Sequence, residues 1–218
     1  MQVKLVDHMG SDLTVVNAAR VSFAKESEWD SVPFANGPIE GHLQHQDEKL
    51  ISYLAKHNHW SPFGHCSIQF HVKAPIFVAR QLVKHQVGLV WNEVSRRYVD
   101  NEPEFYKPTQ WRLKAEDKKQ GSSEETISYS IEPTVQYVTQ TYNNLLKEGV
   151  APEMARMVLP QNLYTEWYWS GTLMAFARVC NLRCAKDTQW ETQQIANQID
   201  KIGEELFPSS WKELRKMT

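Results

Sequence analysis

Alternating apolar and polar residues mark three stretches of the chain as strands. A side chain in a strand points to the opposite face from its neighbour, so apolar residues at every second position line one face. The first stretch is short and opens the sequence, the second precedes Pro75, and the third is rich in tryptophan. The apolar positions are Val3 and Leu5, then Ile68, Phe70 and Val72, then Trp167 and Trp169, which we expect to share a face.

Other stretches carry apolar residues at helical spacing. A helix is expected after the turn at 10–12, another over 46–57, and a long one from Pro133 to about Lys147 with Gly149 as its stop. Near the end of the sequence, Thr188 and Glu191 have the spacing of a capping box before an amphipathic helix. That helix would carry Ile195, Ile199, Ile202 and Leu206.

The stretch 74–98 is the richest in candidate chemistry. Pro75 suits the first turn of a helix, which we expect to end near Gly88. On that helix Gln81, Lys84 and His85 would lie at i, i+3 and i+4 and share one face. The residues that follow are dense in hydrogen-bond donors and would form a loop able to cradle a phosphate monoester, although a solvated basic turn has the same composition. These residues are Asn92, Glu93, Ser95, Arg96 and Arg97.

Two polar stretches interrupt these elements. Residues 24–41 and 114–126 contain glycine, proline, serine and charged residues and are expected to be surface loops. The stretch 114–126 is too short for an interdomain linker, and 218 residues suit one folded unit. We therefore expect residues 1–218 to form a single domain.

Charge and cysteine content exclude several classes of protein. The net charge of -2 gives no general attraction to a nucleic acid polymer. No apolar run is long enough to cross a membrane, and three cysteines without a secretory signal favour the cytoplasm. Cys180 and Cys184 lack the C-x-x-C spacing and are expected to be ordinary helix residues.

Several common motifs are also missing. The sequence has no GxGxxG fingerprint, no P-loop, no nucleophile elbow and no HExxH. Eight histidines alone do not make a metal site, because ligands must converge on one point, so we expect no metal. Eight tryptophans without a basic face favour core, interface or cofactor-lining roles over stacking on nucleic acid.

The chain resembles the flavin-dependent thymidylate synthases. The stretch 73–98 looks like their signature region, whose pattern is Arg-His-Arg, seven residues and then Ser. Here Lys84 and Gln86 stand in place of the two arginines, and eight residues separate Gln86 from Ser95. We expect the additional residue to bulge the loop around 89–91. Further similar blocks follow in the family's order at 59–65, 155–160, 162–165, 181–183 and 189–191.

The resemblance implies a fold, an assembly and ligands. The fold would be α+β, with a central, mostly antiparallel sheet flanked by helices, in a single-domain subunit of a homotetramer with shared active sites. The ligands would be FAD, dUMP, a folate and NADPH. Carried over by position, the residues against FAD would be His59, Ser61, Lys84, His85, Gln86, Glu93, Thr172 and Arg178.

The same resemblance places residues around dUMP and implies a reaction. The reaction would be the reductive methylation of dUMP to dTMP, with 5,10-methylenetetrahydrofolate as the one-carbon donor and FAD reduced by NADPH as the hydride source. Arg183 would be catalytic, because a guanidinium beside the pyrimidine stabilises negative charge on the ring. The residues surrounding dUMP would be Gln81, Lys84, Glu93, Ser95, Arg96, Arg97, Arg156 and Arg183.

Two other functions fit parts of the sequence. The substitutions at Lys84 and Gln86 are compatible with a degenerate homologue that binds dUMP or FAD without turnover. A metal-dependent nucleotide hydrolase would need a carboxylate and histidine cluster. An absorption spectrum separates the coloured flavoproteins from the hydrolase.

Overall fold

A four-stranded sheet forms the centre of the computed structural model, which describes residues 1–31, 41–116 and 121–216. The strand order is β1-β4-β8-β5, and each neighbouring pair is antiparallel. The strands are β1 (Gln2–Met9), β4 (Ser67–Pro75), β8 (Tyr164–Thr172) and β5 (Leu89–Glu93). The predicted antiparallel sheet in a mixed α and β fold is therefore confirmed, whereas the single domain and the homotetramer stay predictions.

The alternation in β4 and β8 decides which face of the sheet is buried. Ile68, Phe70 and Val72 are at most 1% exposed, and so are Trp167 and Trp169 on the paired strand. Val72 pairs with Trp167, and Phe70 pairs with Trp169, so these side chains cover one face together. The predicted strands and the shared face of the two tryptophans are confirmed. Strand β1 lies at the sheet edge and most of its residues are exposed.

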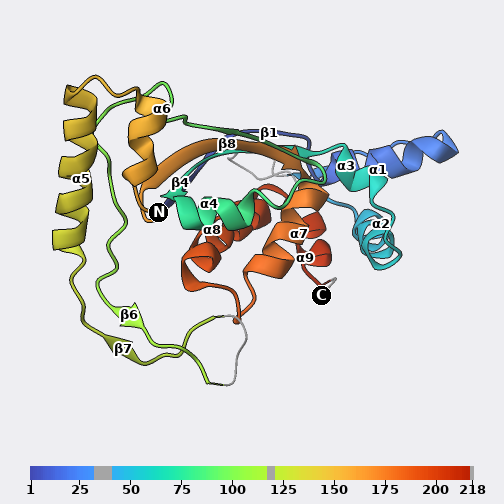
Figure 1. Ribbon diagram of the computed structural model, residues 1–218. Coiled ribbons are helices and arrows are strands. Elements are labelled where there is room, and N and C mark those ends of the chain that lie inside the picture. The colour runs from blue at the N-terminus through green and yellow to red at the C-terminus, as the bar shows by residue number, and fades with distance from the viewer. Residues whose placement is uncertain (32–40, 117–120, 217–218) are drawn as a thin grey trace, which may run out of the picture.

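Helices cover the apolar face of the sheet (Figure 1). Phe176 shows how they join the core, because its ring lies edge-on to Phe70 and to Trp169, with centroids 4.9 and 5.3 Å away. The covering helices are α4 (Ile76–Leu82), α7 (Leu173–Arg183), α8 (Trp190–Leu206) and α9 (Pro208–Leu214).

The N-terminal helices lie at one end of the sheet (Figure 1). They are α1 (Asp12–Arg20) with the 3₁₀ turn η1 (Val21–Phe23), α2 (His45–Lys56) and α3 (Ser61–Gly64). The carboxylate of Asp12 accepts the backbone N–H groups of Ser209 and Ser210 at 2.8 and 2.9 Å. This contact satisfies donors at the N-terminus of α9, which have no partner inside the helix.

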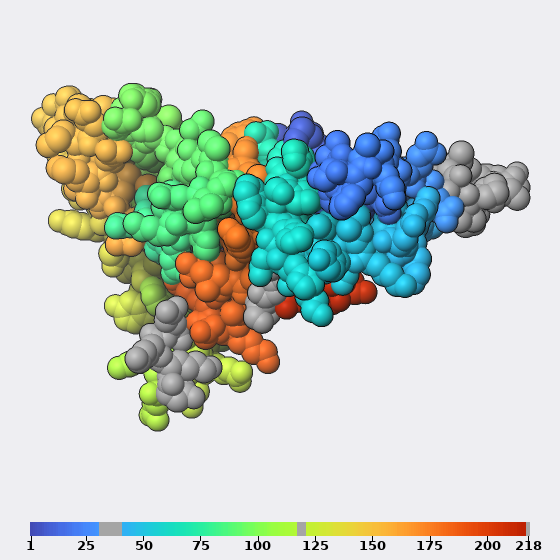
Figure 2. Space-filling model, turned by 90° about the vertical axis from the view of Figure 1, so that its right-hand side faces the viewer, coloured from blue at the N-terminus to red at the C-terminus, as the bar shows by residue number. Residues whose placement is uncertain are grey.

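The remaining elements lie at the other end and in the polar stretches. Helix α5 (Glu132–Lys147) follows the predicted bounds, and Gly149 after it has φ +81°, the left-handed conformation that ends helices. The other elements are α6 (Pro152–Ala155), the 3₁₀ turn η2 (Arg156–Val158), and the short pairs β2 (Asp30–Ser31) with β3 (Gly41–His42) and β6 (Trp111–Arg112) with β7 (Thr126–Ile127). Figure 2 shows the yellow-green β6–β7 stretch projecting from the body. The parts of the predicted loops at 32–40 and 117–120 lie outside the described residues.

The structure corrects the predicted helix over 75–88. Helix α4 begins after Pro75 and ends at Leu82, so Lys84 and His85 lie in the following turn and do not share a helix face with Gln81. Residues 89–93 form the regular strand β5 instead of a bulged loop, because each of them pairs in register with β8. The packing of the partly buried Leu89 and Trp91 beside β8 accounts for this, since Trp91 stacks on Trp167 with centroids 4.3 Å apart.

The predicted capping box before α8 is wrong. The N-cap is Gln189, and no side chain caps the helix. The Thr188 hydroxyl donates to the Leu182 carbonyl instead, and the Glu191 carboxylate binds other side chains. The amphipathic helix itself is confirmed, with Ile195 and Ile199 fully buried.

None of the helices in the described part of the chain is both long enough and apolar enough to cross a membrane.

Candidate active site

The turn between α4 and β5 is fixed against the start of α7. Gly88 has φ +76°, and a side chain there would meet the Ala175 methyl group at 3.1 Å and the Thr172 hydroxyl at 3.2 Å. The Gly88 carbonyl accepts the Thr172 N–H at 3.1 Å. Glycine is therefore required for both the backbone conformation and the close approach. The predicted ligand-contacting residues of this turn are held beside α7.

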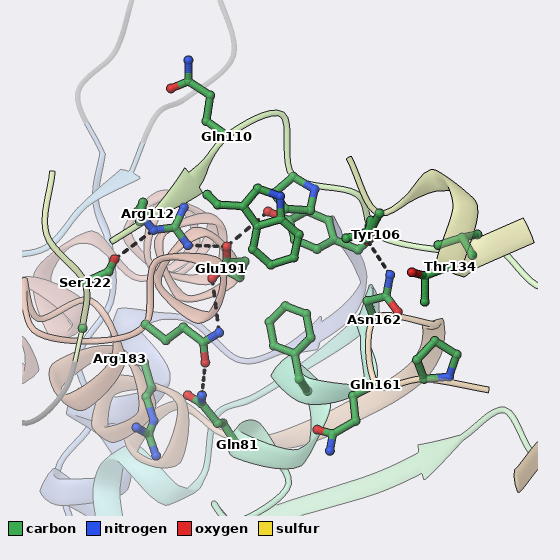
Figure 3. A pocket seen from close by; sticks show the side chains of 18 residues that line it. Gln81, Tyr106, Gln110, Arg112, Ser122, Thr134, Gln161, Asn162, Arg183 and Glu191 are labelled. Atoms are coloured by element: carbon green, nitrogen blue, oxygen red, sulfur yellow. Dashed lines mark hydrogen bonds and ion pairs between the residues drawn. The ribbon is translucent and has the colours of Figure 1, made fainter. Parts of the chain in front are cut away.

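A cavity of about 1080 Å³ lies between α4, the end of α7 and the segments 106–112 and 121–135 (Figure 3). Two predicted substrate residues, Gln81 and Arg183, line it together, although 102 positions separate them in the sequence. Much of the remaining wall is aromatic or apolar, a composition common in ligand sites. These apolar lining residues are Phe77, Tyr106, Pro108, Trp111, Ile131, Val135 and Pro160.

Arg183 is bound to His85 at this cavity. Its Nε donates to His85 Nε2 at 3.0 Å. Burial and the adjacent guanidinium lower the pKa of His85 below its ordinary value of 6.5, and burial lowers the pKa of Arg183. Arginine nevertheless keeps its proton in proteins. Near neutral pH the pair is therefore a charged guanidinium and a neutral imidazole that accepts at Nε2.

A second cavity, of about 480 Å³, holds three other predicted residues. Glu93, Arg96 and Arg156 line it, and it has no lining residue in common with the larger cavity. The Glu93 carboxylate accepts from Thr165 Oγ1 at 2.7 Å and from Trp91 Nε1 at 3.1 Å. Because both carboxylate oxygens are held, Glu93 presents a fixed negative charge to this cavity.

Ser95 and Arg97 lie just beyond Glu93 and line neither cavity. The Ser95 hydroxyl accepts from the backbone N–H and from the Nε of Arg97, both at 3.3 Å. No imidazole contacts this hydroxyl among the described residues, so a base that would make it a nucleophile is not in place. The geometry favours a binding or orienting contact for Ser95.

The two cavity-lining arginines of this region each use one backbone contact. Arg96 donates to the Asn101 carbonyl at 2.6 Å, and Arg156 donates through Nε to the Glu153 carbonyl at 3.2 Å. Their other guanidinium N–H groups have no partner in the described part of the chain and are available to a ligand anion.

Several of the predicted flavin contacts lie on α7 or on elements that contact it. Thr172 is the N-cap of α7 and accepts the Ala175 N–H at 3.2 Å. Arg178 is an exposed residue of the same helix, and α3, which begins at Ser61, packs against it. Lys84 and Gln86 are exposed in the Gly88 turn, and His59 is exposed with its ring edge-on to Tyr53.

This set of groups fits an anionic dinucleotide. Lys84 and Arg178 have no carboxylate within ion-pair distance in the described part of the chain, so their charges are available to a pyrophosphate. Exposed apolar side chains nearby in sequence offer surface to an aromatic ring system. They are Trp60, Val87 and Val90, each more than 60% exposed.

Sequence reasoning missed a polar group of four residues in the wall of the larger cavity. Tyr106, Arg112, Gln189 and Glu191 form a hydrogen-bonded group in its wall. The only signal for this group in the sequence is the block 189–191, which resembles the family but for which the resemblance implies no residue role. The spacing of Thr188 and Glu191 suggested a helix cap, and this interpretation hid the role of the carboxylate.

One cluster has metal-ligating residue types. Cys180, Cys184 and Asp200 bring their ligand atoms within 4.8 Å of one another, and it is the one such group in the described residues. Asp200 Oδ1 already accepts from Trp211 Nε1 and Arg215 Nε, both at 2.7 Å. The adjacent guanidinium opposes a metal cation, so the cluster is better explained by packing between α7, α8 and α9.

Comparisons with known proteins identify relatives of this chain. A family model described as "Thymidylate synthase complementing protein" matches residues 4–209. The flavin-dependent thymidylate synthase of Thermus thermophilus is 41% identical over 213 residues, which are 96% of this chain and 73% of that relative. The enzyme of that name from Thermotoga neapolitana is 40% identical, over 96% of this chain and 88% of the relative.

A solved structure is also similar. It is the UMP/dUMP methylase PolB from Streptomyces cacaoi bound with 5-Br dUMP, with a TM-score of 0.81 and 30% identity over 99% of this chain and 94% of that chain. The fold and the matches define an enzyme of the methyltransferase class. The chain belongs to the flavin-dependent thymidylate synthase family.

Proposed function

We propose that the protein is a thymidylate synthase that converts dUMP to dTMP, with 5,10-methylenetetrahydrofolate as one-carbon donor and FAD reduced by NADPH as hydride source. The observation that carries the proposal is the meeting of Gln81 and Arg183 in one large cavity. Family membership and the nucleotide analogue named for PolB support the choice of substrate.

Arg183 would activate the pyrimidine. Methylation at C5 requires electron density at that carbon, and a guanidinium beside N3 and O2 stabilises negative charge on the ring. His85 holds the guanidinium through its Nε and leaves the terminal N–H groups for the ligand. Because the accepting imidazole is neutral, it does not repel the charge on Arg183.

The substrate phosphate would be held by cations of the second cavity. Arg96 and Arg156 line that cavity, with Ser95 and Arg97 beside it, and guanidinium groups bind phosphate oxygens well. Because Gln81 and Arg183 line a different cavity, we propose that one copy of the chain binds the pyrimidine with these two residues. A second copy would bind the phosphate of the same substrate with its arginines. A homotetramer with shared active sites satisfies this requirement.

FAD, when bound, supplies the hydride. Residues around α7 and α3 would hold it: Lys84 and Arg178 by charge, Thr172, Ser61 and Gln86 by hydrogen bonds, and His59 and His85 by their rings. The carboxylate of Glu93 would orient a donor group of either ligand. We further propose that the protein works in the reducing cytoplasm, where its three free cysteines stay thiols.

The test is tritium release from dUMP labelled at C5, because forming the new C5–C bond expels that hydrogen into water. FAD, methylenetetrahydrofolate and NADPH are omitted in turn, and each omission should stop dTMP formation. A yellow protein that binds dUMP but forms no dTMP in the complete mixture would instead be the degenerate homologue. A colourless protein that does not bind added FAD would refute the proposal.

Gel filtration tests the shared site. The flavin-loaded protein should elute as an oligomer, and a flavin-loaded monomer with full activity would contradict the shared-site arrangement.

A further inference from the structure

The buried carboxylate of Glu191 connects two parts of the larger cavity. Glu191 is 4% exposed. Its Oε1 accepts from Tyr106 at 3.2 Å and pairs with Arg112, while its Oε2 accepts from Gln189 Nε2 at 3.3 Å. Arg112 in turn donates to Ser122 Oγ at 2.9 Å. The carboxylate therefore ties the segment that closes one side of the cavity to the start of α8 (Figure 3).

The hydrogen bonds continue from Gln189 to Gln81. Gln81 Nε2 donates to Gln189 Oε1, and Gln81 Oε1 accepts from Thr192 Oγ1 at 3.0 Å. Each end of the Gln81 amide thus has a protein partner. One N–H and one lone pair of this amide remain for a ligand in the cavity that it lines.

The direction of this chain of bonds is set at Glu191. An ionised carboxylate only accepts hydrogen bonds, whereas an amide group can turn over and exchange its donor and acceptor ends. Glu191 accepts, so Gln189 must present its NH₂ to Glu191 and its oxygen to Gln81. Gln81 must then present its NH₂ to Gln189 and its oxygen to Thr192.

The ion pair and the tyrosine keep Glu191 in this role. Arg112 stabilises the ionised carboxylate, which is needed for a charge this well buried. Burial and Glu191 raise the pKa of Tyr106 to about 12, so the phenol keeps its proton and donates.

We infer that Glu191 is a positioning residue, which fixes through Gln189 the donor and acceptor directions that Gln81 offers to the substrate. The inference rests on the proposed function in one respect, that Gln81 contacts dUMP. It assigns a role to the block 189–191 and gives the buried carboxylate in the cavity wall a purpose.

The test is the affinity for dUMP of the flavin-loaded protein, measured by titration calorimetry. Glu191→Gln keeps the shape of the side chain but lets position 191 donate as well as accept, so the Gln189 and Gln81 amides are no longer held in one direction. We expect the Kd for dUMP to rise about tenfold, because the misdirected Gln81 amide loses one hydrogen bond to the substrate, and tenfold is the upper end of the effect of one such bond.

Asp200→Asn supplies the matched control. Asp200 lies on the same helix, is paired with Arg215 and Trp211, and does not line the cavity. This variant should lower the thermal midpoint and leave the Kd for dUMP within about twofold of the wild-type value. An equal loss of affinity in both variants would show that Glu191 acts through helix stability alone and would overturn the inference.

A double-mutant cycle with Gln81→Ala shows whether the effect passes through Gln81. Residues that act through one contact are not additive, so Glu191→Gln should change the Kd less than about twofold in the Gln81→Ala background. A full tenfold effect there, or an unchanged Kd in the single Glu191→Gln variant, would overturn the inference. A wild-type protein that does not bind dUMP would overturn the proposed function itself.

Discussion

Replacing Arg183 with alanine removes the cation that we assign to the pyrimidine. The cost to the fold is small, because the guanidinium is half-buried and its one hydrogen bond among the described residues goes to His85, at 3.0 Å. Such a bond contributes about 1 kcal/mol to folding in a partly exposed position. The cost to catalysis is larger, since loss of one preorganised group that stabilises developing charge lowers kcat by about 10² to 10³.

The assay compares three quantities for each variant. Tritium release at saturating dUMP gives turnover, the visible absorption band gives flavin content, and urea unfolding gives stability. We expect Arg183→Ala to lose turnover while keeping most of its flavin. Arg183→Lys keeps the charge but loses the Nε that binds His85, so its activity should lie between those of alanine and arginine. Turnover of Arg183→Ala within about tenfold of wild type would refute the assignment.

His85, Ser95 and Gly203 give three more tests. Burial and Arg183 hold the pKa of His85 below 6.5, so the folded protein favours the neutral imidazole. Activity and the stability due to this pair should therefore be complete above pH 6.5 and fall on acidification toward the lowered pKa. His85→Gln, which still accepts a hydrogen bond from Arg183, should remove this dependence in a pH–rate profile. Ser95→Ala should keep measurable dTMP formation and bind dUMP more weakly, as measured by steady-state kinetics. Complete loss of dTMP formation with an unchanged affinity for dUMP would contradict this prediction. Gly203→Ala places a methyl group 2.6 Å from the buried ring of Trp211 and should destabilise the protein by about 1 to 3 kcal/mol in urea unfolding; an unchanged midpoint would mean that the ring can move away.

The sheet could be predicted where side chains alternate between two environments. Ile68, Phe70 and Val72 face the helices, while Gln69 and His71 face away from them. The alternating pattern in β4 therefore indicates a strand and no other element. The end of α4 could not be predicted in this way. Leu82 and Val83 continue the apolar spacing of the helix. The turn depends on Gly88, which must pass close to Thr172, a residue far away in the sequence.

The candidate site was predictable by residue type but not by contact. The family resemblance identified Gln81 and Arg183, which share a cavity, but no local pattern reports that Arg183 meets His85. The hydrogen-bonded group around Glu191 could not be predicted for a related reason. Its partners Tyr106 and Arg112 lie 85 and 79 positions away, a separation at which spacing carries no information about hydrogen bonds.

The contact between Asp12 and the start of α9 has a consequence for the order of synthesis. The acceptor belongs to the first helix, and its donors are 197 and 198 positions later in the chain. A growing polypeptide on the ribosome therefore carries this carboxylate without its partners until residues 209 and 210 have been added. The Asp12 carboxylate and the start of α9 can form their hydrogen bonds only after Ser210 has left the exit tunnel. A chain that stalls before that point therefore leaves the first helix without this contact.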